Sequence, residues 1–300
     1  MCGDVQMQIA IIGFGEAGSA LVRGWGAPLA GGIVVYDKKL DAPQTAAEIT
    51  KRAARLGVAT APSSAEAVAG ADLVLCTVTA DQAVLAAQAA APNLGPGAFW
   101  CDLNSCAPSS KRRAAEVIEA GGGRYVDVAV MAPVHPKLNM VPLLISGPHA
   151  EAIGPLLQSL PMSLRVVDGA VGAASSIKMI RSVMVKGLEA LTAECVLAAV
   201  AAGVEDEVLP SLLSGHPKLD VAERAAYNFE RSLQHGERRA AEMEEVAITL
   251  EDLGLPARIA RATVDWQRQI AGAGIEVPGL ADEAGFRDYA ERLLPKIKGA

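Results

Sequence analysis

The stretch QIAIIGFGEAG, residues 8–18, decides the fold. Residues 8–12 are a short apolar run of the kind that forms a buried strand, and the run ends at a G-x-G-x-x-G pattern. Between such a strand and a helix, the first glycine permits a tight turn, the second lets the backbone approach a pyrophosphate, and the third lets the helix pack closely. The pattern predicts a dinucleotide-binding site with these members: Gly13, Phe14, Gly15, Glu16, Ala17 and Gly18.

An acidic residue stands at the distance from this motif that a dinucleotide site requires. Asp37 follows a second apolar run, Ile33–Tyr36, about 20 residues past the glycines. Its carboxylate can bind ribose hydroxyls and would repel a 2′-phosphate, which favours NAD as the cofactor. Lys38 and Lys39 could attract that same phosphate, so NADP stays possible. Asp37 and Lys38 are therefore predicted cofactor contacts.

Apolar runs and helical stretches alternate through the first half of the chain. Further runs cover residues 73–78, 99–103, 125–131, 142–146 and 164–167. Helical patterns cover residues 15–25, 42–56, 80–91, 109–120 and 150–160. This alternation predicts an α/β fold with a Rossmann-type, doubly wound parallel sheet.

The second half of the chain shows no convincing strand. Residues 172–202 are typical of one helix, which would be about 45 Å long. More helices are expected at residues 204–213, 218–236, 237–253, 257–271 and 281–294, with breaks near Gly203, Pro217, residues 254–256 and residues 278–279. We therefore predict a dinucleotide-binding domain at residues 1–168 and an all-helical domain at residues 169–300.

Composition narrows the class of protein. The 300 residues are 51% hydrophobic and carry a net charge of −7, which disfavours nucleic acid as a partner. The five cysteines form no CxxC pair, so neither a zinc site nor a disulfide framework is indicated. The start MCGDVQMQ lacks the features of a signal peptide, and the uncharged residues 83–101 contain two prolines. We expect a cytoplasmic protein with no membrane segment.

Two candidate segments lie at the ends of the third and fourth predicted strands, residues 73–78 and 99–103. Thr77, Val78 and Thr79 should lie along the ribose and nicotinamide side of the cofactor, although Thr79 would serve equally well as a helix cap. Asn104 and Ser105 would offer polar groups beside the nicotinamide, or form a turn before the next helix. The sequence does not choose between these alternatives.

A lysine at the start of the long helix is the candidate for proton transfer. Gly169 and Gly172 permit a tight entry, and Lys178 then falls on the second turn between Ile177 and Met179. An isolated lysine on a helix is usually a solvated one. Burial among apolar neighbours would instead lower its pKa and suit it to general acid–base work near neutral pH.

In this order, these sites resemble those of the β-hydroxyacid dehydrogenase family, which includes 6-phosphogluconate and 3-hydroxyisobutyrate dehydrogenases. The family's Asp-x-(Ser/Asn)-(Ser/Thr)-x-x-Pro loop matches residues 102–108, and its catalytic lysine matches Lys178. The resemblance implies hydride transfer between a nicotinamide and a small hydroxyacid, with Ser105 touching the substrate. It also implies a homodimer formed through the helical domain.

Departures from the family pattern leave the substrate open. Arg181 stands where the family has Asn or His, and Ser182 stands where the family has Asn. Met131, Ala132 and Pro133 replace a Ser-Gly-Gly segment. A later Lys-Asp pair reads Ala241-Glu242. The chain thus resembles a divergent branch of the family. The predicted substrate contacts are Asn104, Ser105, Met131, Ala132, Arg181, Ser182 and Arg239.

A small anionic substrate is expected from the arginines. His235, Arg238, Arg239 and Glu242 share one helical face, and Arg181 with Arg239 could hold a carboxylate or phosphate, since guanidinium groups suit such anions. A solvated charged face is the alternative. Two further hypotheses remain: an imine reductase-like enzyme, which the lysine disfavours, and a non-catalytic NAD(P)-sensing protein.

Overall fold

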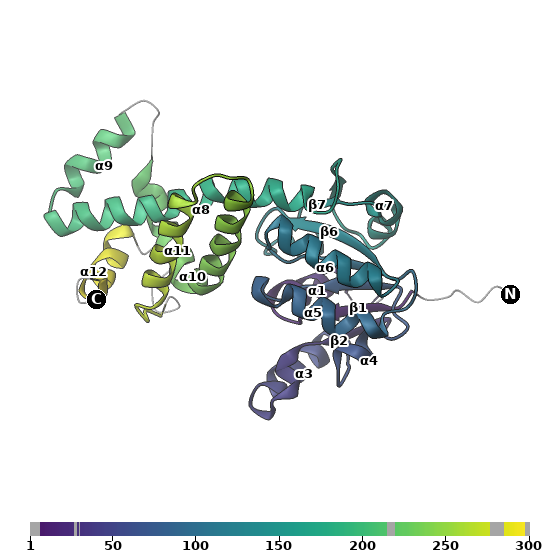
Figure 1. Cartoon of the computed structure of the whole chain (residues 1–300). Coiled ribbons are helices and arrows are strands. Elements are labelled where there is room, and N and C mark those ends of the chain that lie inside the picture. Colours follow the sequence, from purple (N-terminus) through teal and green to yellow (C-terminus); the bar gives the residue numbers. More distant parts are fainter. Residues whose placement is uncertain (1–6, 27–28, 30, 215–219, 277–284, 298–300) are drawn as a thin grey trace. The chain divides into compact units, whose positions relative to one another are not determined.

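The computed structural model describes residues 7–26, 29, 31–214, 220–276 and 285–297 (Figure 1). They divide into two compact units, Met1–Met179 and Ile180–Ala300. All the strands of the described residues lie in the first unit, and the described part of the second is helical. Long helix α8, Ala173–Ala202, contributes residues to both units.

The first unit is built on an eight-stranded sheet with the order β3-β2-β1-β4-β5-β6-β7-β8. This confirms the predicted doubly wound fold, and all seven expected strands are present. The strands are β1 Ile9–Ile12, β2 Ile33–Tyr36, β3 Ala59–Thr60, β4 Leu73–Cys76, β5 Phe99–Asp102, β6 Arg124–Val130, β7 Leu143–Ser146 and β8 Leu164–Val166. The sequence missed β3, because two residues carry no readable pattern.

One pairing departs from the predicted parallel sheet. Strands β6 and β7 are antiparallel, whereas every other neighbouring pair is parallel. A parallel return needs a crossover, usually a helix, on one face of the sheet. The connection from β6 to β7 holds only the short 3₁₀ turn η4, Leu138–Met140, so the chain turns straight back.

Helices cover both faces of this sheet. They are α1 Glu16–Trp25, α3 Pro43–Leu56, α4 Ser64–Val68, α5 Ala83–Ala90, α6 Pro108–Ala120 and α7 Ala150–Ser159. Short 3₁₀ turns are η1 Lys38–Asp41, η2 Ala80–Gln82 and η3 Ala91–Asn93. The sequence did not predict α4, whose five residues are too few to show a helical period.

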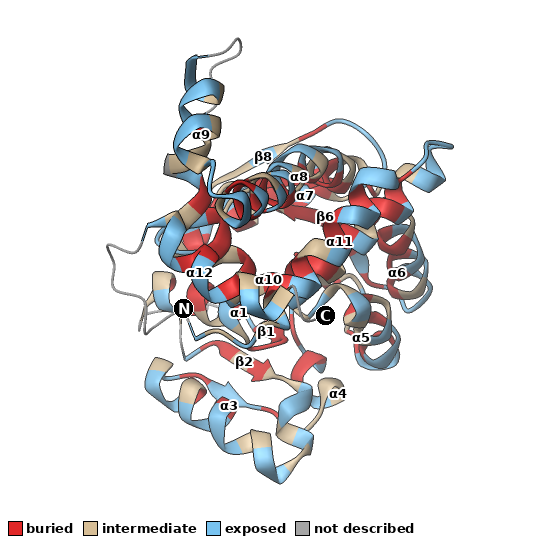
Figure 2. Cartoon of the chain, turned by 90° about the vertical axis from the view of Figure 1, so that its left-hand side faces the viewer, coloured by how far each residue is buried: buried red, intermediate tan, exposed pale blue. Residues whose placement is uncertain are grey.

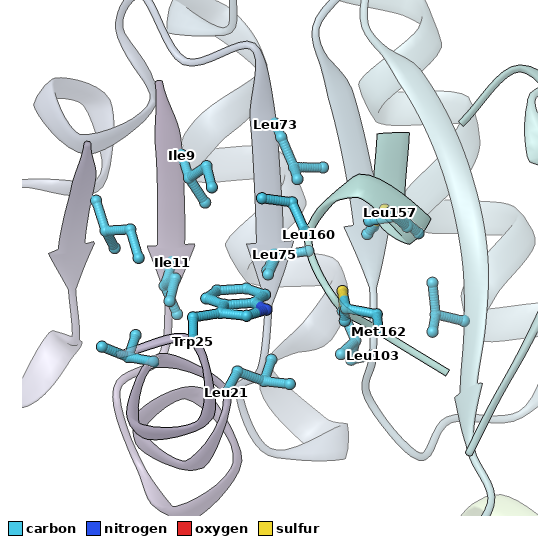
Figure 3. Packing of buried hydrophobic residues seen from close by; sticks show 14 of the residues in the cluster. Ile9, Ile11, Leu21, Trp25, Leu73, Leu75, Leu103, Leu157, Leu160 and Met162 are labelled. Carbon is cyan, nitrogen blue, oxygen red and sulfur yellow. The ribbon is translucent and has the colours of Figure 1, made fainter. Parts of the chain in front are cut away.

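Side-chain alternation along the strands gives the sheet two cores. Ile9 and Ile11 of β1 enter one core with Trp25 of α1, whereas Ala10 and Ile12 enter the other. Figure 3 shows the Trp25 ring beside Leu21 of its own helix and close to residues of β1 and β4. In Figure 2 the central strands are buried, while α3 turns a largely exposed face outward. Burial on both faces explains the nearly continuous apolar runs of the sequence.

The described part of the second unit consists of α-helices. Besides α8 these are α9 Glu205–Ser214, α10 Val221–Asp252, α11 Arg258–Ala271 and α12 Phe286–Ile297. Its core gathers Leu197 of α8, Phe229 of α10, and Tyr289 and Leu293 of α12. The predicted long helix is confirmed by α8. No helix of the described residues is both long and apolar enough to span a membrane.

The prediction that one helix ends at Gly236 and the next begins at Glu237 is wrong. Helix α10 runs unbroken through this residue. A Cβ at Gly236 would lie 2.5 Å from the Gln267 carbonyl oxygen and 2.7 Å from the Ala271 Cβ, both on α11. The glycine therefore permits two helices to pack closely and does not end one. The expected breaks at Pro217 and residues 278–279 lie outside the described residues.

The strand order brings the candidate site residues to one edge of the sheet. The direction of winding reverses between β1 and β4, and ligands of such sheets bind beyond the carboxyl ends of the strands at this reversal. The loops that leave β1, β4 and β5 there contain the glycine motif, Thr77–Thr79 and Asn104–Ser105 respectively.

Candidate active site

An added side chain would meet different surroundings at each of the three glycines of the motif. Gly13 has φ +89°, and a Cβ there would lie 2.7 Å from the Thr77 carbonyl oxygen. A Cβ at Gly18 would lie 2.7 Å from the Gly13 carbonyl oxygen. At Gly15 a Cβ would meet no described atom within 4 Å. The fold itself requires Gly13 and Gly18, whereas Gly15 leaves space that a ligand can use.

The start of α1 fits a phosphate in this space. Gly15 is the N-cap of α1, and no described side chain caps it. Backbone N–H groups at a helix start carry partial positive charge and point outward, which favours an anion. Glu16 and Ala17 form the first turn. The residues present therefore fit the pyrophosphate of a dinucleotide.

Contacts from three elements hold the glycine loop. The Thr77 hydroxyl donates to the Gly13 carbonyl oxygen at 2.5 Å. Asp37 accepts from the Phe14 N–H at 2.8 Å, and Arg52 of α3 donates to the Phe14 carbonyl oxygen at 2.6 Å. The Phe14 side chain is fully buried and its backbone N–H and carbonyl oxygen are both bonded within the protein, so this predicted cofactor contact acts by shaping the loop. No local pattern indicates the role of Arg52, which lies 38 residues from Phe14 in the chain.

The remaining predicted cofactor contacts surround this loop. Lys38 Nζ donates to Gln82 Oε1 at 3.0 Å, which joins the ends of β2 and β4. Val78 is half-buried in the second core of the sheet. Thr79 precedes η2 without capping it, and its hydroxyl, followed by the amide of Gln82, lowers the pKa of Asp81.

Lys178 and Ser105 meet in the first unit. The Lys178 ammonium donates to Ser105 Oγ at 2.6 Å, and both side chains are half-buried. The two residues are separated by 73 positions in the sequence, so the fold alone brings them together. This pair joins an amine to a hydroxyl at the carboxyl edge of β5.

Asn104 directly precedes Ser105 in the chain and is buried. Its backbone N–H donates to Asp102 Oδ1 at 2.9 Å, and its side-chain amide donates to Cys76 Sγ at 3.3 Å. Burial, followed by the charge of Asp102, raises the pKa of Cys76 to about 12. Asn104 Oδ1 is buried without a hydrogen-bond partner among the described residues.

A buried carboxylate holds the start of α8. Asp127 Oδ2 accepts from the N–H groups of Gly172 and Ser175, each at 3.0 Å. Asp127 Oδ1 accepts from the Ser175 hydroxyl at 2.5 Å. The Ser146 hydroxyl donates to Asp127 and accepts from the Ala174 N–H. Asp127 thus caps a helix from a strand far away in sequence, and Lys178 follows one turn later.

A buried lysine, Lys111, joins Asp127 to Asp102, the carboxylate that accepts from the Asn104 N–H. Lys111 Nζ lies 3.0 Å from Asp102 Oδ1 and 3.5 Å from Asp127 Oδ1, and its side chain is 0% exposed. Burial acts to lower the pKa of Lys111, but the two carboxylates raise it above its usual value, so the lysine is charged. The Tyr125 hydroxyl donates to Asp102 at 2.7 Å.

Lys111 is not among the residues predicted from the sequence, although a local signal marks it. Lys111 occupies the same face of α6 as Ala107, Ala114, Ala115 and Ile118, all of them buried. A lysine within an apolar stripe must have partners. What the sequence could not reveal was the identity of those partners, which come from other strands.

The altered substrate loop is partly buried. Met131 and Ala132 follow β6, and Met131 packs against a small cluster that includes Leu144 and Ala174. The Met131 N–H donates to the Pro142 carbonyl oxygen at 2.9 Å. Met131 therefore packs against the cluster to which α8, the helix that carries Lys178, contributes Ala174.

The remaining predicted substrate contacts lie in the second unit. Arg181 is exposed and Ser182 is buried, both on α8. Arg239 of α10 forms an ion pair with Glu189 of α8, whose second oxygen accepts from Gln267 at 3.2 Å. Lys186 donates to Glu242 at 2.5 Å. The charge of Arg239 is thus balanced by a buried carboxylate, a partner that the sequence did not identify.

Family comparison agrees with the geometry of the first unit. Residues 8–160 match the family described as the NAD binding domain of 6-phosphogluconate dehydrogenase. The chain belongs to this family. Residues 199–270 match a second family, described as a domain of unknown function (DUF1932).

Three relatives extend this comparison. A conserved hypothetical protein from Sinorhizobium meliloti 1021 is 38% identical, with a TM-score of 0.74 over 98% of this chain and 97% of that one. An uncharacterized 28.5 kDa protein of Methanothermus fervidus is 27% identical over 210 residues, 69% of this chain and 76% of that protein. A conserved protein described as structurally similar to 3-hydroxyacid dehydrogenases is 28% identical, with a TM-score of 0.64 over 90% and 100% of the two chains.

More distant structures share the fold. The 3-hydroxyisobutyrate dehydrogenase of Mycobacterium tuberculosis is 17% identical with a TM-score of 0.69, over 96% of this chain and 98% of that one. An imine reductase from Myxococcus stipitatus, solved with NADP⁺, is 20% identical with a TM-score of 0.53, over 96% and 99%. With the family match and the fit of the glycine loop, the cofactor is NAD or NADP. The chain is a divergent member of the 6-phosphogluconate dehydrogenase-like family.

Proposed function

We propose that this protein transfers a hydride between a nicotinamide cofactor and a small hydroxyacid or its carbonyl form, with Lys178 as the general acid and base. The hydrogen bond of 2.6 Å between Lys178 Nζ and Ser105 Oγ carries the proposal. The bond joins an amine and a hydroxyl at the carboxyl ends of the strands, where the glycine loop would hold the dinucleotide, and this supports the proposal.

The protein's residues handle the proton and the orientation. When bound, the cofactor supplies or accepts the hydride. For oxidation, neutral Lys178 takes the proton of the substrate hydroxyl, and for reduction, protonated Lys178 returns it to the forming alkoxide. Ser105 orients the reacting oxygen through its own hydroxyl. Asn104, whose buried Oδ1 lacks a partner among the described residues, is placed to accept one hydrogen bond from a ligand.

We further propose NAD over NADP and an anionic substrate. Asp37 holds a carboxylate beside the Phe14 N–H, where a 2′-phosphate would meet its charge. Arg181 lies three residues past Lys178 and therefore on a neighbouring part of the same helical face. We propose it as the contact of the anion, because it is exposed and lies within one helical turn of Lys178. Met131, Ala132 and Ser182 remain proposed substrate neighbours.

The test is a turnover screen with a matched pair of variants. NAD, NADP and their reduced forms are combined with hydroxyacids and phosphorylated sugar acids. We expect Lys178→Ala to lower turnover about 10²–10⁴-fold while the affinity for NADH stays unchanged. Lys51→Ala removes an exposed lysine of α3 and should change neither quantity. Near-normal turnover in Lys178→Ala would overturn the proposal.

The same screen includes ketones mixed with amines, because the fold is also that of an imine reductase. Reduction of an imine that survives Lys178→Ala would replace the hydroxyacid proposal. Tight NADH binding with no turnover on any substrate would instead favour a sensing protein.

We also propose a homodimer, in a reducing compartment such as the cytoplasm. Helix α8 exposes Ile180, Met184, Leu188 and Leu191 along one stripe at spacings of three and four residues. A second copy would cover this stripe. Met184→Glu should halve the molar mass measured by light scattering, whereas Tyr227→Glu, at an exposed position of α10, should not. A monomeric wild-type protein would contradict the proposal.

The described cysteines form no disulfide bond.

A further inference from the structure

We propose that Lys111 is a positioning residue, which sets the separation of Lys178 and Ser105 through the carboxylates of Asp127 and Asp102. Lys111 touches neither member of the pair in the contacts of the described residues. It acts through two links, one to each member of the pair.

The first link leads to Ser105. Lys111 Nζ donates to Asp102 twice, to the carbonyl oxygen at 2.6 Å and to Oδ1 at 3.0 Å. The same Oδ1 accepts from the Asn104 N–H, the residue directly before Ser105. Tyr125 occupies the other oxygen of Asp102. The course of the chain from Asp102 to Ser105 is therefore held by bonds to one carboxylate.

The second link leads to Lys178. Asp127 accepts from Gly172, from Ser175 and from Ser146, and Lys111 balances its charge at 3.5 Å. Ser175 lies one helical turn before Lys178. The rotation of α8 about its axis, and with it the direction of the lysine side chain, depends on where Asp127 stands.

Stability alone does not account for the lysine. A buried ion cluster is often no more stable than apolar residues of the same volume, because desolvation offsets the attraction. A cluster with every polar group bonded does, however, select one arrangement of its elements. Lys111 donates to Asp102 and to the Val128 carbonyl oxygen, so it joins β5, β6 and α6 at a single nitrogen.

The experiment compares variants of graded severity in the full chain. Lys111→Met keeps the length of the side chain and removes the charge, whereas Tyr125→Phe and Ser175→Ala each remove one hydrogen bond and serve if Lys111→Met does not fold. Arg113→Met removes an exposed cation from the same helix and is the control.

The kinetic readout rests on the proposed function. With the best substrate of the screen, we expect Lys111→Met to lower kcat about 100-fold, the scale for a misplacement of about 1 Å, with the Kd for NADH changed less than about twofold. In a Lys178→Ala background the same substitution should lower the residual rate less than about twofold, because the two residues act as a unit. Equal losses in both backgrounds, or a matching loss of NADH affinity, would reduce Lys111 to a structural role and overturn the inference.

A second readout needs no substrate, so failure of the proposed function does not decide this inference. Amide exchange of residues 172–178, followed by mass spectrometry, should be roughly tenfold faster in Lys111→Met and less so in Ser175→Ala and Tyr125→Phe. The rate at which an N-hydroxysuccinimide ester acetylates Lys178 should also change, most in Lys111→Met and less in Ser175→Ala and Tyr125→Phe. Exchange and acetylation like those of Arg113→Met in all three variants would overturn the inference.

Discussion

The two units each bury a cluster of ions, and the clusters differ in how completely their polar atoms are paired. In the first unit, Lys111 is fully buried between Asp102 and Asp127, and the charged groups of all three side chains are bonded, although the neutral Asn104 Oδ1 beside them is unpaired among the described residues. In the second unit, Arg239 pairs with Glu189 and Lys186 with Glu242. There Arg239 Nε and Gln267 Oε1 are buried without partners among the described residues.

This difference shows what each cluster can do. A network whose charged groups are all bonded favours one arrangement, because a shift leaves a buried charge unpaired. A partly bonded network loses less when its elements move. The first cluster is thus suited to hold the Lys178–Ser105 pair in place, and the second ties helices together without determining their positions to the same degree.

The largest effect is expected from Lys111→Met. Two buried carboxylates would lose their only cation among the described residues, so we expect a loss of about 3–5 kcal/mol in the free energy of unfolding. Urea denaturation followed by fluorescence measures it, in a Trp266→Phe background that leaves Trp25 and Trp100 of the first unit as reporters. Arg113→Met should cost less than about 0.5 kcal/mol.

A smaller loss is expected from the same substitution in the second cluster. Lys186→Met leaves one carboxylate, Glu242, whose side chain is 20% exposed and so keeps some hydration. The expected loss is about 1.5–3 kcal/mol, the range for a hydrogen bond between charged groups. Fluorescence of Trp266, with Trp25 and Trp100 replaced by Phe, reports on this unit. A larger loss here than for Lys111→Met would reverse the comparison.

Alkaline pH tests the burial of Cys76 beside the first cluster, with the smallest expected effect when stated for one pH unit. The Cys76 thiol, which accepts from Asn104, keeps its proton in the folded chain up to about pH 12 but loses it near pH 9.0 in the unfolded chain. The unfolded state then binds fewer protons, so stability is intact below pH 9 and falls by up to about 1.4 kcal/mol per pH unit above it. In Cys76→Ala this contribution to the slope should vanish. An unchanged slope between pH 9 and 11 would contradict the burial of that thiol.

The fold was largely predictable because its signals are local. The glycine motif, the apolar runs and the long helix all depend on residues close together in sequence, and β1, β2 and α8 lie where these patterns place them. Predictions failed where a local signal had a distant cause. Gly236 resembled a break but serves the contact with α11, and the apolar run of β7 does not show that this strand pairs antiparallel with β6.

For the site, the sequence by itself determined which residue types are available: the glycine loop, Asp37, Ser105 and Lys178. It also determined their order along a doubly wound sheet, because strand and helix periods are written in short stretches. Only the tertiary structure decided that Lys178 bonds Ser105, that Glu189 balances Arg239, and that Lys111 lies between Asp102 and Asp127. A buried charge must find its partner wherever packing leaves one, and such partners come from strands and helices that the sequence keeps far apart.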